Sequence, residues 1–145
     1  MRDLPRQLST DELAELFEGR TRLVELLATR EHPLENAAAA IAELSEEERL
    51  EALKAHPPIG ARDLSSRSAE EQGRDAEPAV LTELAYLNQV YEEKFGFRFV
   101  VFVNRRPKAE ILEVLRSRLE RTREEELETA LSELVEIARD RWARG

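Results

Sequence analysis

The chain has 145 residues, of which 41% are hydrophobic and 37% are charged, so its length and composition suit one domain with a packed core. Its 22 Lys and Arg residues against 31 Asp and Glu residues give a formal net charge of −9, which argues against a broad nucleic-acid-binding surface. No apolar run approaches the roughly 20 residues that a membrane-spanning helix needs. There is no cysteine for a disulfide or thiolate site and no apolar signal-peptide stretch at the N-terminus. We therefore expect a soluble protein of the cytoplasm that binds neither nucleic acid nor membranes.

Helical periodicity dominates the first third of the chain. Ser9 and Glu12 form a capping-box pattern, and Ser45 and Glu48 form another, which predicts helices beginning after the two serines. Pro57 follows the second of these helices and ends it, because the residue before a proline disfavours the helical conformation. Apolar residues recur at helical spacing in three runs, namely Leu13, Leu16 and Phe17; Leu23, Leu26 and Leu27; and Ala37, Ala40, Ile41 and Leu44.

The pattern weakens from His56 to about residue 79, where we expect a long loop containing a short helix. Helical spacing then resumes in a run that ends at Gly96, in a helix with Pro107 at its first position, and in a last helix. The apolar stripes of these helices are Leu84, Leu87, Tyr91 and Phe95; Ile111, Leu112, Leu115 and Leu119; and Leu127, Leu131, Leu134, Ala138 and Trp142.

Residues 97–103 depart from this helical pattern. They are rich in aromatic and β-branched residues, which favour a strand, but no other segment offers a partner strand. We predict a buried extended segment whose backbone groups are available to a ligand or to side chains. The predicted fold is all-α, with residues 1–145 in a single domain. It is a bundle of about seven to nine helices with one buried extended segment near residues 97–103.

His56 is the first candidate for chemistry. It lies at a helix exit before two prolines, and its imidazole suits proton transfer near neutral pH. The alternative is a structural histidine that interacts with the helix dipole. His32 also precedes a proline, so the His-Pro pair by itself indicates little.

Two further candidates lie later in the chain. Glu71 could orient a histidine, and Gln72 could hydrogen-bond an amide-rich ligand, although Ser68 and Glu71 also fit a structural capping box. Arg118 could bind a carboxylate or ureido group with its forked donors, or could be a solvated arginine that pairs with nearby glutamates. With two histidines and no cysteines, no metal-binding motif is recognisable, and no glycine-rich phosphate loop is present.

In their order and spacing, these motifs resemble one family across essentially the whole chain, the 2-oxo-4-hydroxy-4-carboxy-5-ureidoimidazoline (OHCU) decarboxylases. Arg98 and Arg121 depart from the family pattern, where proline and asparagine are usual. The segments that carry the resemblance are Ala55-His56-Pro57-Pro58-Ile59-Gly60; Ser68-x-x-Glu71-Gln72; Leu87-Asn88-x-x-Tyr91-x-x-x-Phe95-Gly96-Phe97-x-Phe99-Val100-Val101; and Ile111-Leu112 with Arg118-Leu119.

The resemblance implies an all-α carboxy-lyase that converts OHCU to (S)-allantoin in urate degradation without cofactor or metal, often as a homodimer. It implies that His56 is the catalytic acid/base and that Glu71 assists it. The implied substrate contacts are Pro57, Ser68, Glu71, Gln72, Phe99, Val100, Val101, Phe102, Val103 and Arg118. Two alternatives remain at this point, namely a non-enzymatic helical interaction module and an enzyme of the same fold that acts on a related ureido compound.

Overall fold

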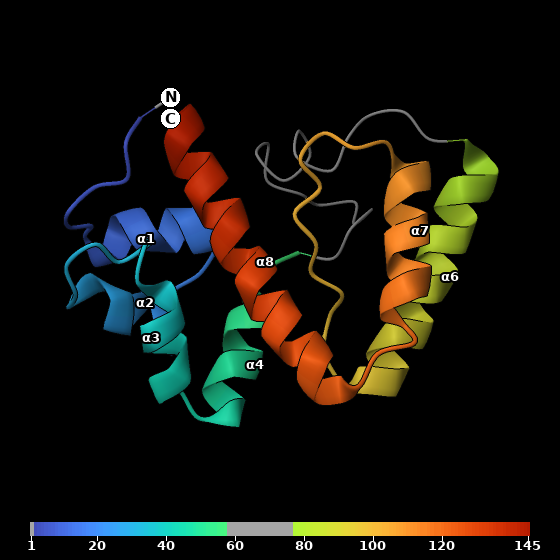
Figure 1. The fold of residues 1–145 in the computed structure, drawn as a ribbon, viewed down its shortest axis with the longest axis horizontal. Coiled ribbons are helices and arrows are strands. Elements are labelled where there is room, and N and C mark those ends of the chain that lie inside the picture. The colour runs from blue at the N-terminus through green and yellow to red at the C-terminus, as the bar shows by residue number, and fades with distance from the viewer. Residues whose placement is uncertain (1, 58–76) are drawn as a thin grey trace. The chain divides into compact units, whose positions relative to one another are not determined.

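A computed structural model describes residues 2–57 and 77–145, which hold seven α-helices and no strand (Figure 1). This confirms the all-α prediction for the described part of the chain. Two compact units are present, Met1–His56 with Leu131–Gly145, and Pro57–Ala130. The prediction of one domain stays a prediction. The short helix expected between His56 and residue 79 falls mostly on residues 58–76, outside the described ones.

The first unit consists of four short helices and the end of a long one, and two of the short helices begin where the capping boxes predict. Its helices are α1 (Thr10–Phe17), α2 (Arg22–Ala28), α3 (Ala37–Glu43), α4 (Glu46–Ala55) and, from Leu131 onward, α8 (Arg123–Arg144). Ser9 and Ser45 both form the reciprocal capping boxes, with their side chains accepting from the backbone N–H groups of Glu12 and Glu48. The central helix α2 packs against α1, α3 and α4 (Figure 1), so the predicted apolar runs form one core.

The second unit contains α6 (Pro78–Phe95), α7 (Lys108–Arg118) and the first part of α8. Helices α6 and α7 lie side by side (Figure 1). Gly96 ends α6 in the left-handed conformation, with φ 82°, as predicted for a glycine at that position. Pro107 is the N-cap of α7, one position before the first helical residue that the sequence predicts it to be. Its ψ of 152° is extended, while its carbonyl already accepts from the N–H groups of Glu110 and Ile111, so it caps α7 rather than opening it.

The extended segment at residues 97–103 has no strand partner among the described residues, and most of its side chains are buried. Its aromatic rings gather around Tyr91 of α6, with ring centroids 5.3 Å away for Phe99 and 6.0 Å for Phe97. Edge-on aromatic packing of this kind stabilises a core beyond the area that it buries. The prediction of a buried extended segment is therefore confirmed. None of the described helices has the length and apolar character that would let it cross a membrane.

Candidate active site

His56 occupies the C-cap of α4, at the predicted end of that helix. Its backbone is extended, with φ −79° and ψ 131°, and its N–H donates to the carbonyl of Leu53 at 3.2 Å. The residue is only 8% exposed, so it is not a histidine on a solvated helix end. Pro57, which follows it, is half-buried.

Three of the other predicted site residues, Ser68, Glu71 and Gln72, lie outside the described residues. Their roles stay predictions. His56 belongs to the first unit, whereas the remaining predicted residues that the structure describes belong to the second unit.

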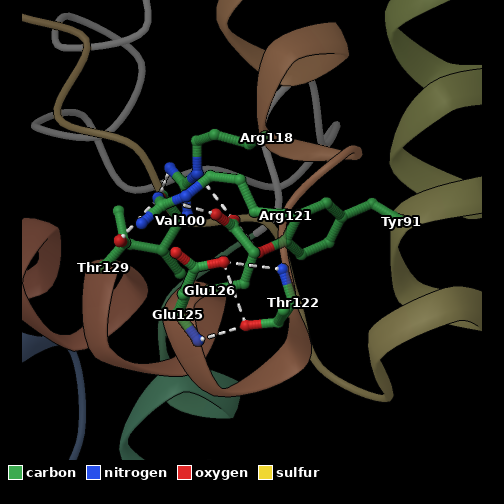
Figure 2. A network of polar contacts seen from close by, with 8 residues as sticks. All are labelled: Tyr91, Val100, Arg118, Arg121, Thr122, Glu125, Glu126 and Thr129. Atoms are coloured by element: carbon green, nitrogen blue, oxygen red, sulfur yellow. Dashed lines mark hydrogen bonds and ion pairs between the residues drawn. The ribbon is translucent and has the colours of Figure 1, made fainter.

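Arg118 is buried in the second unit, with 6% of its surface exposed. It follows Ile111 and Leu115 at spacings of seven and three residues, which places it on the buried face of α7. Its Nε donates to Oε1 of Glu126 at 2.7 Å, and its Nη1 donates to the carbonyl of Val100 at 2.7 Å (Figure 2). Arg118 is therefore not solvated, although it does pair with a glutamate as the alternative stated. The predicted apolar stripe is also corrected at its end, because Leu119 is only half-buried and Arg118 takes the inward position.

Glu126 is the centre of a polar network around Arg118 (Figure 2). It is 0% exposed, and its Oε1 also accepts from the hydroxyl of Tyr91 at 2.5 Å. Its Oε2 accepts from Nη1 of Arg121 at 3.0 Å, and the same nitrogen donates to Oγ1 of Thr129 at 2.8 Å. Burial, followed by the hydrogen bond to Glu126, raises the pKa of Tyr91, so the phenol is a neutral donor.

The charge of Arg118 is not fully neutralised within this network. Two guanidinium groups, those of Arg118 and Arg121, share the single carboxylate of Glu126, so this carboxylate neutralises Arg118 only in part. The side chain of Arg121 is 37% exposed and interacts electrostatically with Glu125, so its charge is screened, whereas the guanidinium of Arg118 is buried. The network is consequently suited to one additional anionic group.

One donor of Arg118 points to where such a group would bind. Its Nη2 is buried and has no hydrogen-bond partner among the described residues. Buried polar atoms are nearly always paired, so a buried guanidinium nitrogen without a partner needs a specific explanation. A ligand oxygen that accepts from Nη2 would supply one.

Backbone carbonyls of the extended segment accept hydrogen bonds from side chains. This is one of the two alternatives that the sequence predicts for them, the other being contact with a ligand. The carbonyl of Val100 accepts from Arg118, and those of Phe102 and Val103 accept from Arg106. Contact of the segment with a ligand stays a prediction. Arg118 is nevertheless brought against it, with its guanidinium carbon 4.7 Å from the ring centroid of Phe99.

Sequence reasoning missed Tyr91, Arg121 and Glu126 as parts of this network. The sequence predicts Tyr91 only as part of an apolar stripe, and it distinguishes Arg121 only as a departure from a family pattern. A signal for Glu126 did exist, because it precedes Ala130 and Leu134 by four and eight residues and so shares their buried face of α8. A carboxylate on an apolar stripe indicates a buried partner of opposite charge.

No group of three histidine, cysteine or acidic side chains that could hold a metal ion occurs in the part of the chain that the structure describes. A family model described as OHCU decarboxylase matches residues 2–143. The chain belongs to the OHCU decarboxylase family.

This OHCU decarboxylase family member is similar to several proteins of known function. The chain is 35% identical over 106 residues to a 2-oxo-4-hydroxy-4-carboxy-5-ureidoimidazoline decarboxylase of Halalkalicoccus jeotgali, which covers 70% of the chain and 60% of the relative. It is 29% identical over 154 residues to the uric acid degradation bifunctional protein PucL of Bacillus subtilis, which covers 99% of the chain and 31% of the relative. The chain thus spans less than two thirds of the length of each of these relatives.

Two solved structures share this fold. A crystal structure of an OHCU decarboxylase in the presence of (S)-allantoin matches with a TM-score of 0.77 at 27% identity, covering 92% of this chain and 96% of that one. A crystal structure of an (S)-allantoin synthase matches with a TM-score of 0.69 at 25% identity, covering 91% of this chain and 47% of that one. Fold and family therefore agree.

Proposed function

We propose that this protein is a carboxy-lyase that decarboxylates OHCU to (S)-allantoin in urate degradation. The observation that carries the proposal is the buried guanidinium of Arg118, whose carboxylate partner Glu126 is shared with Arg121 and whose Nη2 has no hydrogen-bond partner among the described residues. OHCU carries one carboxylate, and a guanidinium is the side chain best shaped to hold a carboxylate. Membership of the OHCU decarboxylase family supports the choice of substrate.

The chemistry follows from the structure of the substrate. When the bond between C4 and the carboxylate breaks, its electron pair forms a C4–C5 double bond, and the pair of the neighbouring C5=N bond moves to nitrogen, which takes a proton. The 4-hydroxyl group then loses its proton and becomes a carbonyl, while C5 takes a proton on one face. The ring itself accepts the electrons, so the proposed reaction requires no metal or cofactor.

His56 is the proposed acid/base for these proton transfers, with Glu71 fixing its tautomer or a substrate N–H. Fixed donors such as Arg118 stabilise charge best in a site from which water is excluded. The other proposed substrate contacts are Pro57, Ser68, Gln72, Phe99, Val100, Val101, Phe102 and Val103. A single domain, a homodimer and a cytoplasmic location complete the proposal.

The test of this function is the decay of freshly generated OHCU with and without the protein. We expect the protein to accelerate the loss of the OHCU absorbance in proportion to its concentration. A decay rate that does not depend on protein would contradict the proposed function. Turnover of a different ureido acid but not of OHCU would favour an enzyme of the same fold with another substrate.

Activity is expected to survive exhaustive dialysis against EDTA. The reason is the donor set, since the chain has two histidines and no cysteine from which to build a transition-metal site. The measurement is the OHCU decay rate before and after dialysis, with a metal-dependent enzyme treated in parallel. Activity that is lost to the chelator and restored by one added metal would overturn the cofactor-free mechanism.

Glu71→Gln is expected to lower turnover sharply while leaving the free energy of unfolding almost unchanged. Glutamine closes a capping box as well as glutamate does, so a structural role would tolerate this change. A carboxylate beside the imidazole favours the protonated form of the imidazole. Loss of the carboxylate would therefore shift the acid limb of the pH–rate profile to lower pH. Wild-type turnover with an unshifted profile would leave Glu71 as a capping residue only.

A further inference from the structure

Glu126 contacts no proposed reacting atom, yet it is more completely buried than any other carboxylate described in the second unit. We propose that Glu126 is a positioning residue, which fixes the guanidinium of Arg118 so that Nη2 is the donor presented to the substrate carboxylate. The identity of that carboxylate rests on the proposed function. The positioning itself rests on the contacts within the network.

The contacts of Arg118 define one orientation of its guanidinium. Glu126 binds at Nε and the carbonyl of Val100 binds at Nη1, both at 2.7 Å, so two different nitrogens of the planar group are held. The ring of Phe99 lies 4.7 Å from the guanidinium carbon and limits its movement further. The remaining nitrogen, Nη2, is the one without a partner among the described residues.

Glu126 is itself held at both oxygens. Oε1 accepts from Tyr91 as well as from Arg118, and Oε2 accepts from Arg121. Its carboxylate therefore cannot rotate without breaking a buried hydrogen bond, which is costly. A support that is fixed in this way keeps a binding group within the narrow geometry that tight binding needs.

Arg121 affects the charge of the network as well as its rigidity. A pair formed by Arg118 and Glu126 alone would be neutral and would attract an anion weakly. With Arg121 on the second oxygen, Glu126 can hold Arg118 while neutralising it only in part. A purely structural cluster would gain nothing from a buried donor that has no partner among the described residues.

Glu126→Gln and its neighbour Glu125→Gln form a matched pair of variants. Glu125 is exposed and accepts hydrogen bonds from the backbone and hydroxyl of Thr122 at the start of α8, and it interacts with Arg121 only through the attraction of their charges (Figure 2). We expect Glu126→Gln to raise the KM for OHCU by about 10- to 100-fold, the usual value of a hydrogen bond to a charged group, with a smaller change in kcat. Glu125→Gln should keep the wild-type KM, because glutamine also closes that cap.

A double-mutant cycle distinguishes positioning from a general structural role. If Glu126 acts through Arg118, Glu126→Gln should add little to the loss of kcat/KM that Arg118→Lys causes by itself. If the losses of kcat/KM caused by the two substitutions instead multiply in the double variant, the proposal is overturned. A wild-type KM in Glu126→Gln would overturn it as well. Should Glu126→Gln fail to fold, Tyr91→Phe removes one hydrogen bond from the same carboxylate and should raise KM in the same direction by a smaller factor.

A measurement without substrate separates this inference from the proposed function. In the 15N NMR spectrum, the Nε–H of Arg118 should exchange slowly with solvent in the wild type and in Glu125→Gln, and rapidly in folded Glu126→Gln. Equal exchange in the two variants would overturn the positioning role. A wild type that shows this difference but does not turn over OHCU would overturn the proposed substrate alone.

Discussion

His56→Asn is expected to fold like the wild type and to lose turnover of OHCU by about 10²- to 10⁴-fold, the usual contribution of a general acid/base. The backbone of His56 keeps its hydrogen bond to Leu53 in the variant, so the end of α4 should be unaffected. Asparagine is close to histidine in shape but does not titrate near neutral pH. The measurement is kcat under saturating OHCU, with the far-UV circular dichroism spectrum as the check on folding.

The chain offers a matched control for this variant. His32 also precedes a proline, but its side chain is 47% exposed and its φ is 48°, a conformation that asparagine tolerates well. His32→Asn should therefore keep both activity and stability. Equal turnover in His56→Asn and the wild type would remove His56 from the mechanism.

Arg118→Met is expected to lower both substrate binding and stability. Breaking one side of a buried ion pair usually costs about 3–5 kcal/mol, and we expect the lower end of that range because Glu126 keeps Arg121 and Tyr91 as partners. The kcat/KM for OHCU should fall by at least about 100-fold, since the forked donor for the carboxylate is lost. Urea unfolding and steady-state kinetics measure the two effects.

Arg116→Met is the control for Arg118→Met, because it makes the same change two residues away on α7. Arg116 pairs with Glu83 and Glu113 at the surface. Exposed pairs of this kind contribute about 0–1 kcal/mol. Similar losses of stability and activity in the two variants would contradict a special role for Arg118.

Much of the fold could be predicted because its signals are local. Ser9 and Ser45 each satisfy a helix start within three residues, and Gly96 permits the left-handed end of α6. The segment at residues 97–103 was predictable by a different route, since strand-forming residues without a partner strand have to be buried in another way. Pro107 shows the limit of such signals, because its fixed φ suits both a cap and a first helical residue.

The site was predicted less completely, because its contacts join elements that are distant in sequence. Arg118 could be selected from its type and place, but whether it was solvated depended on how α7 packs. The hydrogen bond between Tyr91 and Glu126 joins residues that are 35 positions apart. No spacing rule for a single helix reports such a pair, and this is why the partners of Arg118 emerged only from the structure.

The optical activity of the product tests the central claim most directly. Protonation of C5 by water alone has no preference for a face, so spontaneous decay of OHCU should give racemic allantoin. In the presence of the protein, circular dichroism of the product should show (S)-allantoin in excess, with the signal growing at the rate of OHCU loss. Racemic product at a rate equal to spontaneous decay would contradict the proposal that this protein decarboxylates OHCU and protonates it on one face.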